Sequence, residues 1–107
     1  MNLSIAKDFS ETPGPRSRDE GDFSGEQFLE ECLLPRYERA VGQNEQLNID
    51  LDGTEGYATS FLEASFGGLA RVHDPRQVLA NLTFKSNDEP YLIEEIKKYI
   101  QQAREAA

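Results

Sequence analysis

One stretch of alternating residues fixes the kind of sheet that this chain can form. In residues 47–52, LNIDLD, apolar and polar side chains alternate, which is typical of a strand with one buried face. Residues 78–85, VLANLTFK, alternate in the same way. Strands of a sheet covered on both faces are instead continuously apolar. We therefore expect helices chiefly on one face of a rather open sheet.

The remaining elements are predicted from periodicity and turn residues. Residues 3–9 predict a first strand, and residues 11–22 predict a turn-rich loop in which residues 16–18 pair as a hairpin arm. Three helices are expected, beginning near Ser24, Thr59 and Glu89. Ser24 is the predicted N-cap of the first, and Pro35 predicts a kink or a break before a short segment ending at residue 42. The second helix is expected to end at residue 72. It connects two strands that should be parallel.

Composition and charge limit the functions open to this chain. Its 107 residues predict a single domain over residues 1–107, and no apolar stretch approaches the roughly 20 residues of a membrane helix. The lone cysteine, Cys32, excludes an internal disulfide and fits a reducing cytosol, so we expect a cytoplasmic protein. The net charge of −9 argues against nucleic acid and anionic membranes as partners. It favours a soluble monomer or weak dimer.

Residues 47–69 also carry a pattern with chemical consequences. The strand over residues 47–52 is followed by a short acidic loop that contains Gly53 and Gly56. An apolar pattern at helical spacing then begins at Thr59 or Ser60. This order brings two hydroxyl groups to a helix N-terminus, where the amides and the helix dipole favour an added negative charge such as a phosphate.

The same residues resemble the STAS domains (sulfate transporter and anti-sigma-factor antagonist). Those domains carry an Asp-Leu-x-Gly turn after a strand and then Asp-Ser-Ser-Gly-Leu at the start of a helix. Residues 50–54, DLDGT, match the first motif, and residues 58–62, ATSFL, lie at the spacing of the second. Ala58 replaces the family's Asp, Thr59 stands in the place of the phosphoacceptor Ser, and Phe61 replaces Gly. The whole chain is more similar to a STAS-like family of unknown function than to the sporulation antagonists.

The resemblance implies a fold and a function. The fold is α/β, a two-layer STAS-like domain with a mixed sheet of about four strands and three main helices chiefly on one face. The function is that of a non-catalytic regulatory module, similar to the anti-sigma antagonists, with Thr59 and Ser60 as candidate phosphorylation sites. The implied protein partner is a histidine-kinase-like ATPase or a Ser/Thr kinase. Its predicted binding surface comprises Asp52, Gly53, Glu55, Gly56, Tyr57, Thr59, Ser60 and Glu63.

Structural roles compete with functional ones in this segment. Ser60 is a candidate N-cap with Glu63 as its capping-box partner. Phe61 is expected in the core, whereas Tyr57 is the better candidate for a surface contact. The carboxylates around the turn have no further metal-ligand pattern beside them, so we expect no metal site. Asp52 is expected instead to hydrogen-bond its own backbone at the turn.

The alternative function is a small-ligand, nucleotide or anion sensor. Arg16 and Arg18 lie in a loop rich in Pro and Gly, close before the helix start at Ser24, and helix starts attract anions. The Gly-Lys-Ser/Thr sequence of a Walker A loop is missing. An enzyme is the third possibility, and neither a Ser/His/Asp nor a Cys/His pattern supports it. We therefore predict no catalytic residue and no cofactor.

Overall fold

A computed structural model describes residues 1–106 and places all its strands in one small sheet. The strands are β1 (Asn2–Ser4), β2 (Leu47–Asp50) and β3 (Leu82–Lys85), in the order β1-β2-β3. Both pairs are parallel, with Leu3 beside Ile49 and Ile49 beside Phe84. The parallel pairing of the second and third strands is confirmed. The expected mixed sheet of about four strands is wrong, because residues 1–106 form only three strands, all parallel.

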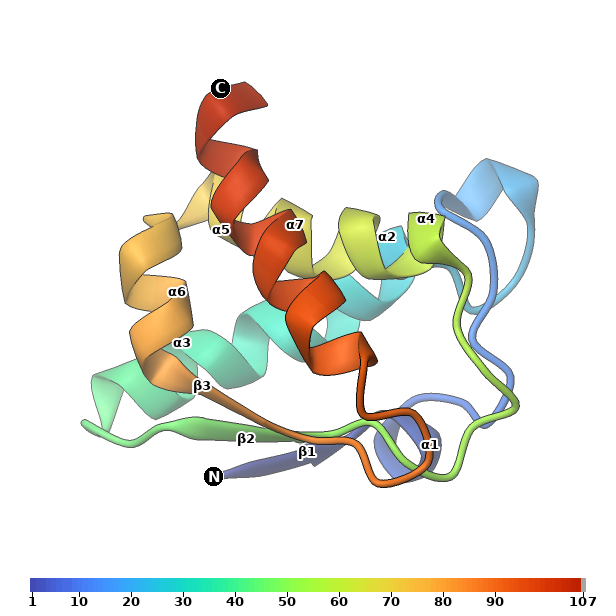
Figure 1. The fold of residues 1–107 in the computed structure, drawn as a ribbon, viewed down its shortest axis with the longest axis horizontal. Coiled ribbons are helices and arrows are strands. Elements are labelled where there is room, and N and C mark those ends of the chain that lie inside the picture. Colours follow the sequence, from blue (N-terminus) through green and yellow to red (C-terminus); the bar gives the residue numbers. More distant parts are fainter. Residues whose placement is uncertain (107) are drawn as a thin grey trace.

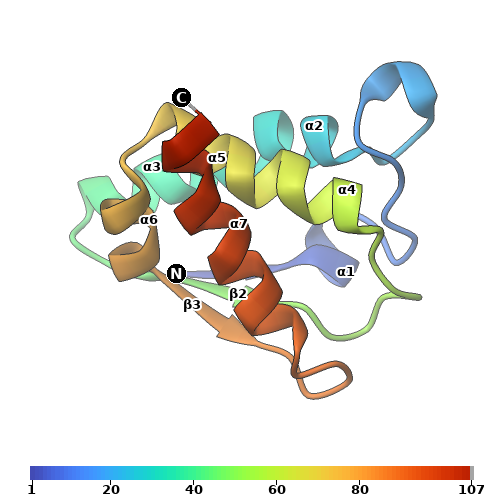
Figure 2. The same cartoon turned by 45° about the horizontal axis from the view of Figure 1, so that its top comes forward.

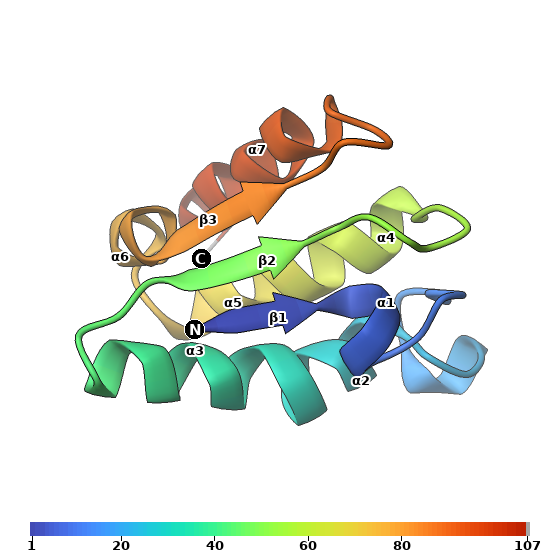
Figure 3. The same cartoon turned by 90° about the horizontal axis from the view of Figure 1, so that it is seen from below.

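The helices form the second layer. Figure 1 shows the sheet as the lower layer and the long helices above it. Figure 3 shows the opposite face of the sheet uncovered, as the alternating strands predicted. The helical segments are α1 (Ile5–Asp8), the 3₁₀ turn η1 (Arg18–Glu20), α2 (Gly25–Phe28), the π turn η2 (Leu29–Leu33), α3 (Leu34–Gly42), α4 (Thr59–Leu62), the π turn η3 (Glu63–Gly67), α5 (Gly68–Val72), α6 (Pro75–Asn81) and α7 (Leu92–Ala106).

The core lies between the sheet and three long helical units, which are residues 25–42, residues 59–72 and α7. Leu3 and Ile49, which are partners in register, turn toward the helices and are almost fully buried, whereas Asn48, the residue before Ile49, is exposed. Aromatic rings join two helical units to each other, with Phe28 stacked on Phe61 at 5.7 Å, and join a helical unit to the sheet, with Phe66 edge-on to Phe84 of β3 at 5.8 Å. Figure 2 shows the first two helical units lying side by side, with α7 crossing beside them.

The first strand is shorter than predicted because a helix cap ends it. The prediction of a strand over residues 3–9 fails after Ser4. The Ser4 hydroxyl accepts from the Lys7 amide (3.2 Å), and the Asp8 carboxylate accepts from the Ser4 amide (2.8 Å). Ser4 is therefore the N-cap at which α1 starts, and the bond to Asp8 holds its own amide. The predicted hairpin arm over residues 16–18 is also wrong, because Ser17 caps the η1 turn instead of pairing with β1.

Pro35 neither breaks nor ends its helix. Residues 25–42 are helical throughout, with Ser24 as the confirmed N-cap, whose hydroxyl accepts from the Gln27 amide. Just before the proline, the Leu34 amide donates to the Leu29 carbonyl, five residues back. This wider π turn changes the carbonyl register where a proline ring collides with a regular α-helix. Of the two predicted outcomes, a kink or a break, the break is wrong, since the helix continues through a local π turn.

The third predicted strand is a helix in its first half. Residues 78–81 belong to α6, and β3 begins only at Leu82. Asp74 caps this helix by accepting from the Arg76 amide (3.2 Å), and Pro75 occupies its first turn. Proline is favoured there because its missing N–H has no helical partner in any case. The alternating pattern therefore begins four residues before the strand itself.

Close helix packing depends on a glycine at the start of α2. A Cβ atom at Gly25 would lie 2.6 Å from the Phe61 carbonyl oxygen and 3.0 Å from the Ala64 Cβ. The first of these neighbours is backbone, so it cannot turn aside. By contrast, a Cβ atom at Gly42, at the end of α3, meets nothing within 4 Å.

We predict opposite effects of alanine at these two glycines. Gly25→Ala should lower the free energy of unfolding by about 1–3 kcal/mol, because it overpacks the contact between α2 and α4. Gly42→Ala should leave it unchanged or raise it by up to about 1 kcal/mol, because alanine favours the helix. Urea denaturation followed by circular dichroism measures both. Equal effects of the two substitutions would contradict the close contact between Gly25 and the Phe61 backbone.

Candidate functional site

The loops after β2 and β3 hold one another through carboxylates. Asp52 accepts from the amides of Asn87 (3.0 Å) and Asp88 (2.9 Å). In return, the Asp88 carboxylate accepts from the Gly53 amide (3.2 Å). The backbone bonds from Asp88 and Asn87 lower the pKa of Asp52. The prediction that Asp52 bonds its own turn was wrong. Asp50 has that role, since its side chain accepts from the Asp52 amide.

Tyr57 ties the end of this loop back to its beginning. Its hydroxyl donates to the Leu51 carbonyl (2.7 Å), and its ring lies against Phe61, with centroids 6.0 Å apart. Burial raises the pKa of Tyr57 to about 12. Phe61 is fully buried, as expected. Tyr57 is half-buried, so it braces the loop from within and is less of a surface contact than its sequence predicts.

The start of α4 is left without a cap. Its N-cap residue is Ala58, whose side chain has no hydrogen-bonding atom. The amides of Phe61 and Leu62 donate to the Ala58 carbonyl. Within residues 1–106, no partner is found for the amides of Thr59 and Ser60. Helix starts usually satisfy such donors with a side chain.

The two hydroxyl residues differ in exposure. Thr59 is exposed, whereas Ser60 is half-buried. The predicted capping box between Ser60 and Glu63 is wrong, because the helix begins one residue earlier, at Thr59. The predicted boundaries of this helix, residues 59 and 72, are confirmed.

Glu63 is instead the centre of an ion-pair cluster. Its carboxylate lies 2.5 Å from Arg16 Nη1 and 2.7 Å from Arg71 Nη1. The bond from Arg71, with the second bond from Arg16, lowers the pKa of Glu63. The cluster fastens the loop before α2 to the helical unit of residues 59–72. Arg71 was not predicted as a partner of Glu63. It follows Glu63 by eight residues, whereas side chains that pair on a regular helix are three or four residues apart, and a π turn lies between the two.

The predicted anion site at the start of α2 is filled by the chain itself. The amides of Gly25 and Glu26 donate to the carbonyls of Pro15 and Arg16. The next amide donates to the hydroxyl of Ser24, which is fully buried. Of the two arginines expected there, Arg16 pairs with Glu63 as described.

Arg18 is also paired with carboxylates. Its guanidinium lies 3.1 Å from Glu30 and 3.3 Å from Glu31. The two arginines therefore turn to different carboxylates rather than toward one anion, and the donors of the helix start are in use.

Other features bear on the remaining predictions. Within residues 1–106, no group of three or more His, Cys, Asp or Glu side chains is arranged to hold a metal ion. In the same part of the chain, no helix is both long and apolar enough to cross a membrane. Cys32 is half-buried, and burial raises the pKa of its thiol.

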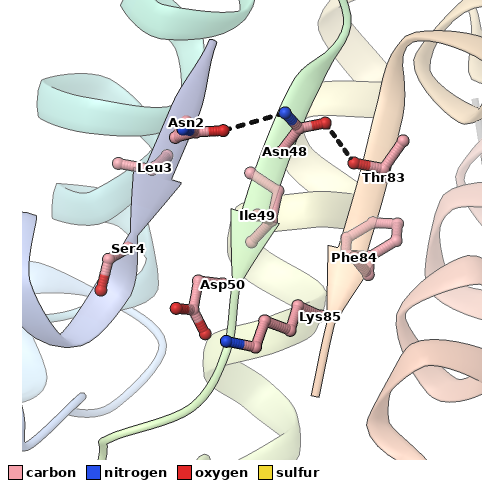
Figure 4. Close-up of a pocket in the computed structure, with 9 residues that line it drawn as sticks. All are labelled: Asn2, Leu3, Ser4, Asn48, Ile49, Asp50, Thr83, Phe84 and Lys85. Carbon is pink, nitrogen blue, oxygen red and sulfur yellow. Dashed lines mark hydrogen bonds between the residues drawn. The ribbon is translucent and has the colours of Figure 1, made fainter. Parts of the chain in front are cut away.

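A shallow depression lies on the open face of the sheet. It has a volume of about 300 Å³ and is lined by residues of all three strands (Figure 4). Asn48 Nδ2 donates to Asn2 Oδ1 (2.9 Å), and Thr83 Oγ1 donates to Asn48 Oδ1, which links the strands by a row of polar side chains. Sequence alternation predicted this polar face but not the ladder, since the register between strands was unknown.

Comparison with known families identifies the fold. The family model described as "STAS-like domain of unknown function (DUF4325)" matches residues 24–92, from the cap of α2 to the start of α7. The chain belongs to this STAS-like family. No curated protein and no solved structure matches the chain. The matched region includes the whole uncapped start of α4, so the family assignment and the candidate site rest on the same part of the STAS-like domain.

We predict that a capping side chain at position 58 stabilises the STAS-like domain. Ala58 already has the extended backbone of an N-cap (φ −71°, ψ 143°). Ala58→Ser supplies an oxygen to a free amide of the first turn and should raise the free energy of unfolding by about 1 kcal/mol. Ala58→Gly, which supplies no oxygen, is the control and should change it by less. Urea denaturation compares them, and no gain with serine would mean that those amides already have partners.

We also predict an alkaline signature of Tyr57. Its pKa is raised in the folded state, so its contribution to stability is complete below the ordinary pKa near 10 and is lost as the pH rises toward 12. Tyr57→Phe removes the bond to Leu51 and should cost about 1 kcal/mol at neutral pH. Tyrosinate absorbance in an alkaline titration should lose its highest-titrating component in this variant. An unchanged titration curve would contradict the buried position of Tyr57.

Proposed function

We propose that this STAS-like domain is a non-catalytic regulatory module that binds a protein partner at the start of α4. The docking surface is the loop of residues 53–58 together with the first turn of the helix. The observation that carries this proposal is the pair of amides at Thr59 and Ser60 that have no partner within residues 1–106, beside the exposed Thr59 side chain. A partner that supplies a carboxylate or carbonyl oxygen satisfies those donors.

Phosphorylation of Thr59 is the proposed switch. A phosphate adds about −1.5 to −2 charges and three acceptor oxygens at pH 7. The uncapped helix start tolerates that charge, because its amides and dipole stabilise an anion. A docked partner that presents an acidic or apolar surface does not tolerate it. Thr59 is favoured over Ser60 as the acceptor because it is the exposed one of the two.

The partner class comes from the resemblance to the anti-sigma-factor antagonists. It is a histidine-kinase-like ATPase, or a Ser/Thr kinase that acts on Thr59, and the proposal places both proteins in the cytoplasm. The alternative of an anion or nucleotide sensor at Arg16, Arg18 and Ser24 has less support. Both arginines are paired with carboxylates there, and the first amides of α2 have partners within the chain.

The proposal is tested with a matched pair of substitutions. Incubated with a kinase of this class and ATP, the wild type should gain one phosphate by intact-mass spectrometry, Ser60→Ala should gain it too, and Thr59→Ala should not. Thr59→Glu should weaken binding of the ATPase partner at least about tenfold, whereas the neutral Thr59→Gln, of the same size, should not. Calorimetry measures both affinities. Phosphate on Thr59→Ala, or equal binding by the Glu and Gln variants, would falsify the switch.

A further inference from the structure

The exposed apolar side chains of this chain are divided between the two ends of the sheet. Within residues 1–106, the large apolar side chains that are exposed are Phe23, Val41, Val72 and Tyr91. The two valines lie at the ends of α3 and α5, from which the chain returns to the starts of β2 and β3. Phe23 precedes the cap of α2, and Tyr91 directly precedes α7. Figure 3 shows the starts of α2, α4 and α7 toward the end of the sheet to which the strands point. The two aromatic rings are therefore at the end that carries the start of α4.

Phe23 is exposed at a cost to its own backbone. Its φ angle of 56° lies in the left-handed region, where a Cβ atom is crowded. Asn44 has the same conformation, but asparagine tolerates it because its short polar side chain can hydrogen-bond locally. The Gly14 amide donates to the Phe23 carbonyl (2.8 Å), and the Phe23 ring stands edge-on to Phe9 (5.7 Å). The loop is thus fixed with a large aromatic side chain 40% exposed, and backbone strain of this kind gathers at binding sites.

Contacts beneath the surface join both exposed rings to the start of α4. The Phe9 ring, against which Phe23 packs, lies 6.3 Å from the ring of Phe61 in the first turn of α4. On the other side, Tyr91 ends the loop after β3, which is bound to the loop before α4 through the carboxylate of Asp52. The uncapped helix start is therefore flanked by two exposed aromatic side chains.

The surface around the two rings is acidic. Glu11, Asp22, Glu55 and Asp88 are exposed there, and within residues 1–106 none of these four carboxylates forms an ion pair. The Glu55 amide donates to the Glu11 carbonyl (2.9 Å), which holds the loop before α4 beside the loop after α1. Asp22 adjoins Phe23 in the chain. These carboxylates repel an acidic partner and attract basic side chains.

We propose that the protein partner encloses Phe23 and Tyr91 in apolar pockets and carries basic side chains around them, so that Thr59 faces the apolar centre of the interface. This inference rests on the proposed function and specifies its partner. Of the acidic and apolar surfaces that would not tolerate a phosphate on Thr59, it selects the apolar one. A phosphate there would be withdrawn from water into an apolar contact, and the cost of this desolvation releases the partner.

Alanine substitutions at the two rings test this interface, with the histidine-kinase-like ATPase of the proposed function as the probe. Phe23→Ala and Tyr91→Ala should each weaken binding at least about tenfold in calorimetry, because enclosed aromatic side chains carry much of the binding free energy. Tyr91→Phe, which keeps the ring but loses the bond to Glu89, should bind as the wild type does. Val41→Ala and Val72→Ala, the controls at the other end of the sheet, should bind within about twofold of the wild type.

The salt dependence of association is an independent measurement. The association rate constant should fall as the salt concentration rises, because screening weakens the attraction between the basic side chains of the partner and these carboxylates. A rate constant that stays the same or rises with salt would overturn the inference.

The binding data separate this inference from the proposed function. If either alanine variant binds as tightly as the wild type while Thr59→Glu binds more weakly, the inference is overturned and the proposed function stands. An ATPase that does not bind the wild type overturns both. Tyr91 is exposed, so Tyr91→Ala decides the matter even if Phe23→Ala fails to fold.

Discussion

All the long helices of this domain share a single face of a three-stranded sheet, and this one-sided burial governs the rest of the structure. The core has to be formed between that face and three helical units, which must therefore lie close to one another. Gly25 lets α2 approach the backbone of Phe61, and a Cβ atom at Gly68 would meet Leu29. The helical units of residues 25–42 and 59–72 each contain a π turn, one before Pro35 and the other over Glu63–Gly67. Dense packing above the sheet is thus achieved by local departures from regular helix geometry.

The uncapped start of α4 is placed by contacts from two sides. From the sheet side, Asp52 and Asp88 hold the loops after β2 and β3 together. From the helix side, Glu63 links Arg16 and Arg71, so the loop before α2 is fastened near the same helical unit. The helix start is thereby fixed in position, although the amides of Thr59 and Ser60 have no partner in the part of the chain that the structure describes. This region is held by contacts with neighbouring loops rather than by a local cap, because the side chain of Ala58 cannot accept a hydrogen bond.

Local signals in the sequence were sufficient for part of this arrangement. The helix over residues 59–72 and the N-cap at Ser24 follow from short-range spacing, and the one-sided sheet follows from alternation. The error at residues 78–81 arose because alternation competed with the Asp74-Pro75 helix start, and the capping bond prevailed. The ion pairs of Glu63 and the bonds from Asn87 and Asp88 to Asp52 join residues far apart in the chain. No short-range sequence pattern predicts such contacts, so the surroundings of the candidate site could not be predicted from the sequence.

The bond from Tyr57 to the Leu51 carbonyl closes the loop into a ring that begins on the sheet and ends at the helix. A loop closed in this way has its shape before any encounter. The proposed binding would therefore order this loop little further, and preorganisation of this kind lowers the conformational entropy cost of binding. For the proposed binding, a preformed surface predicts association without rearrangement of the loop, with rate constants of about 10⁵–10⁷ M⁻¹s⁻¹. Differences in affinity among the proposed partners would then lie mainly in their dissociation rates.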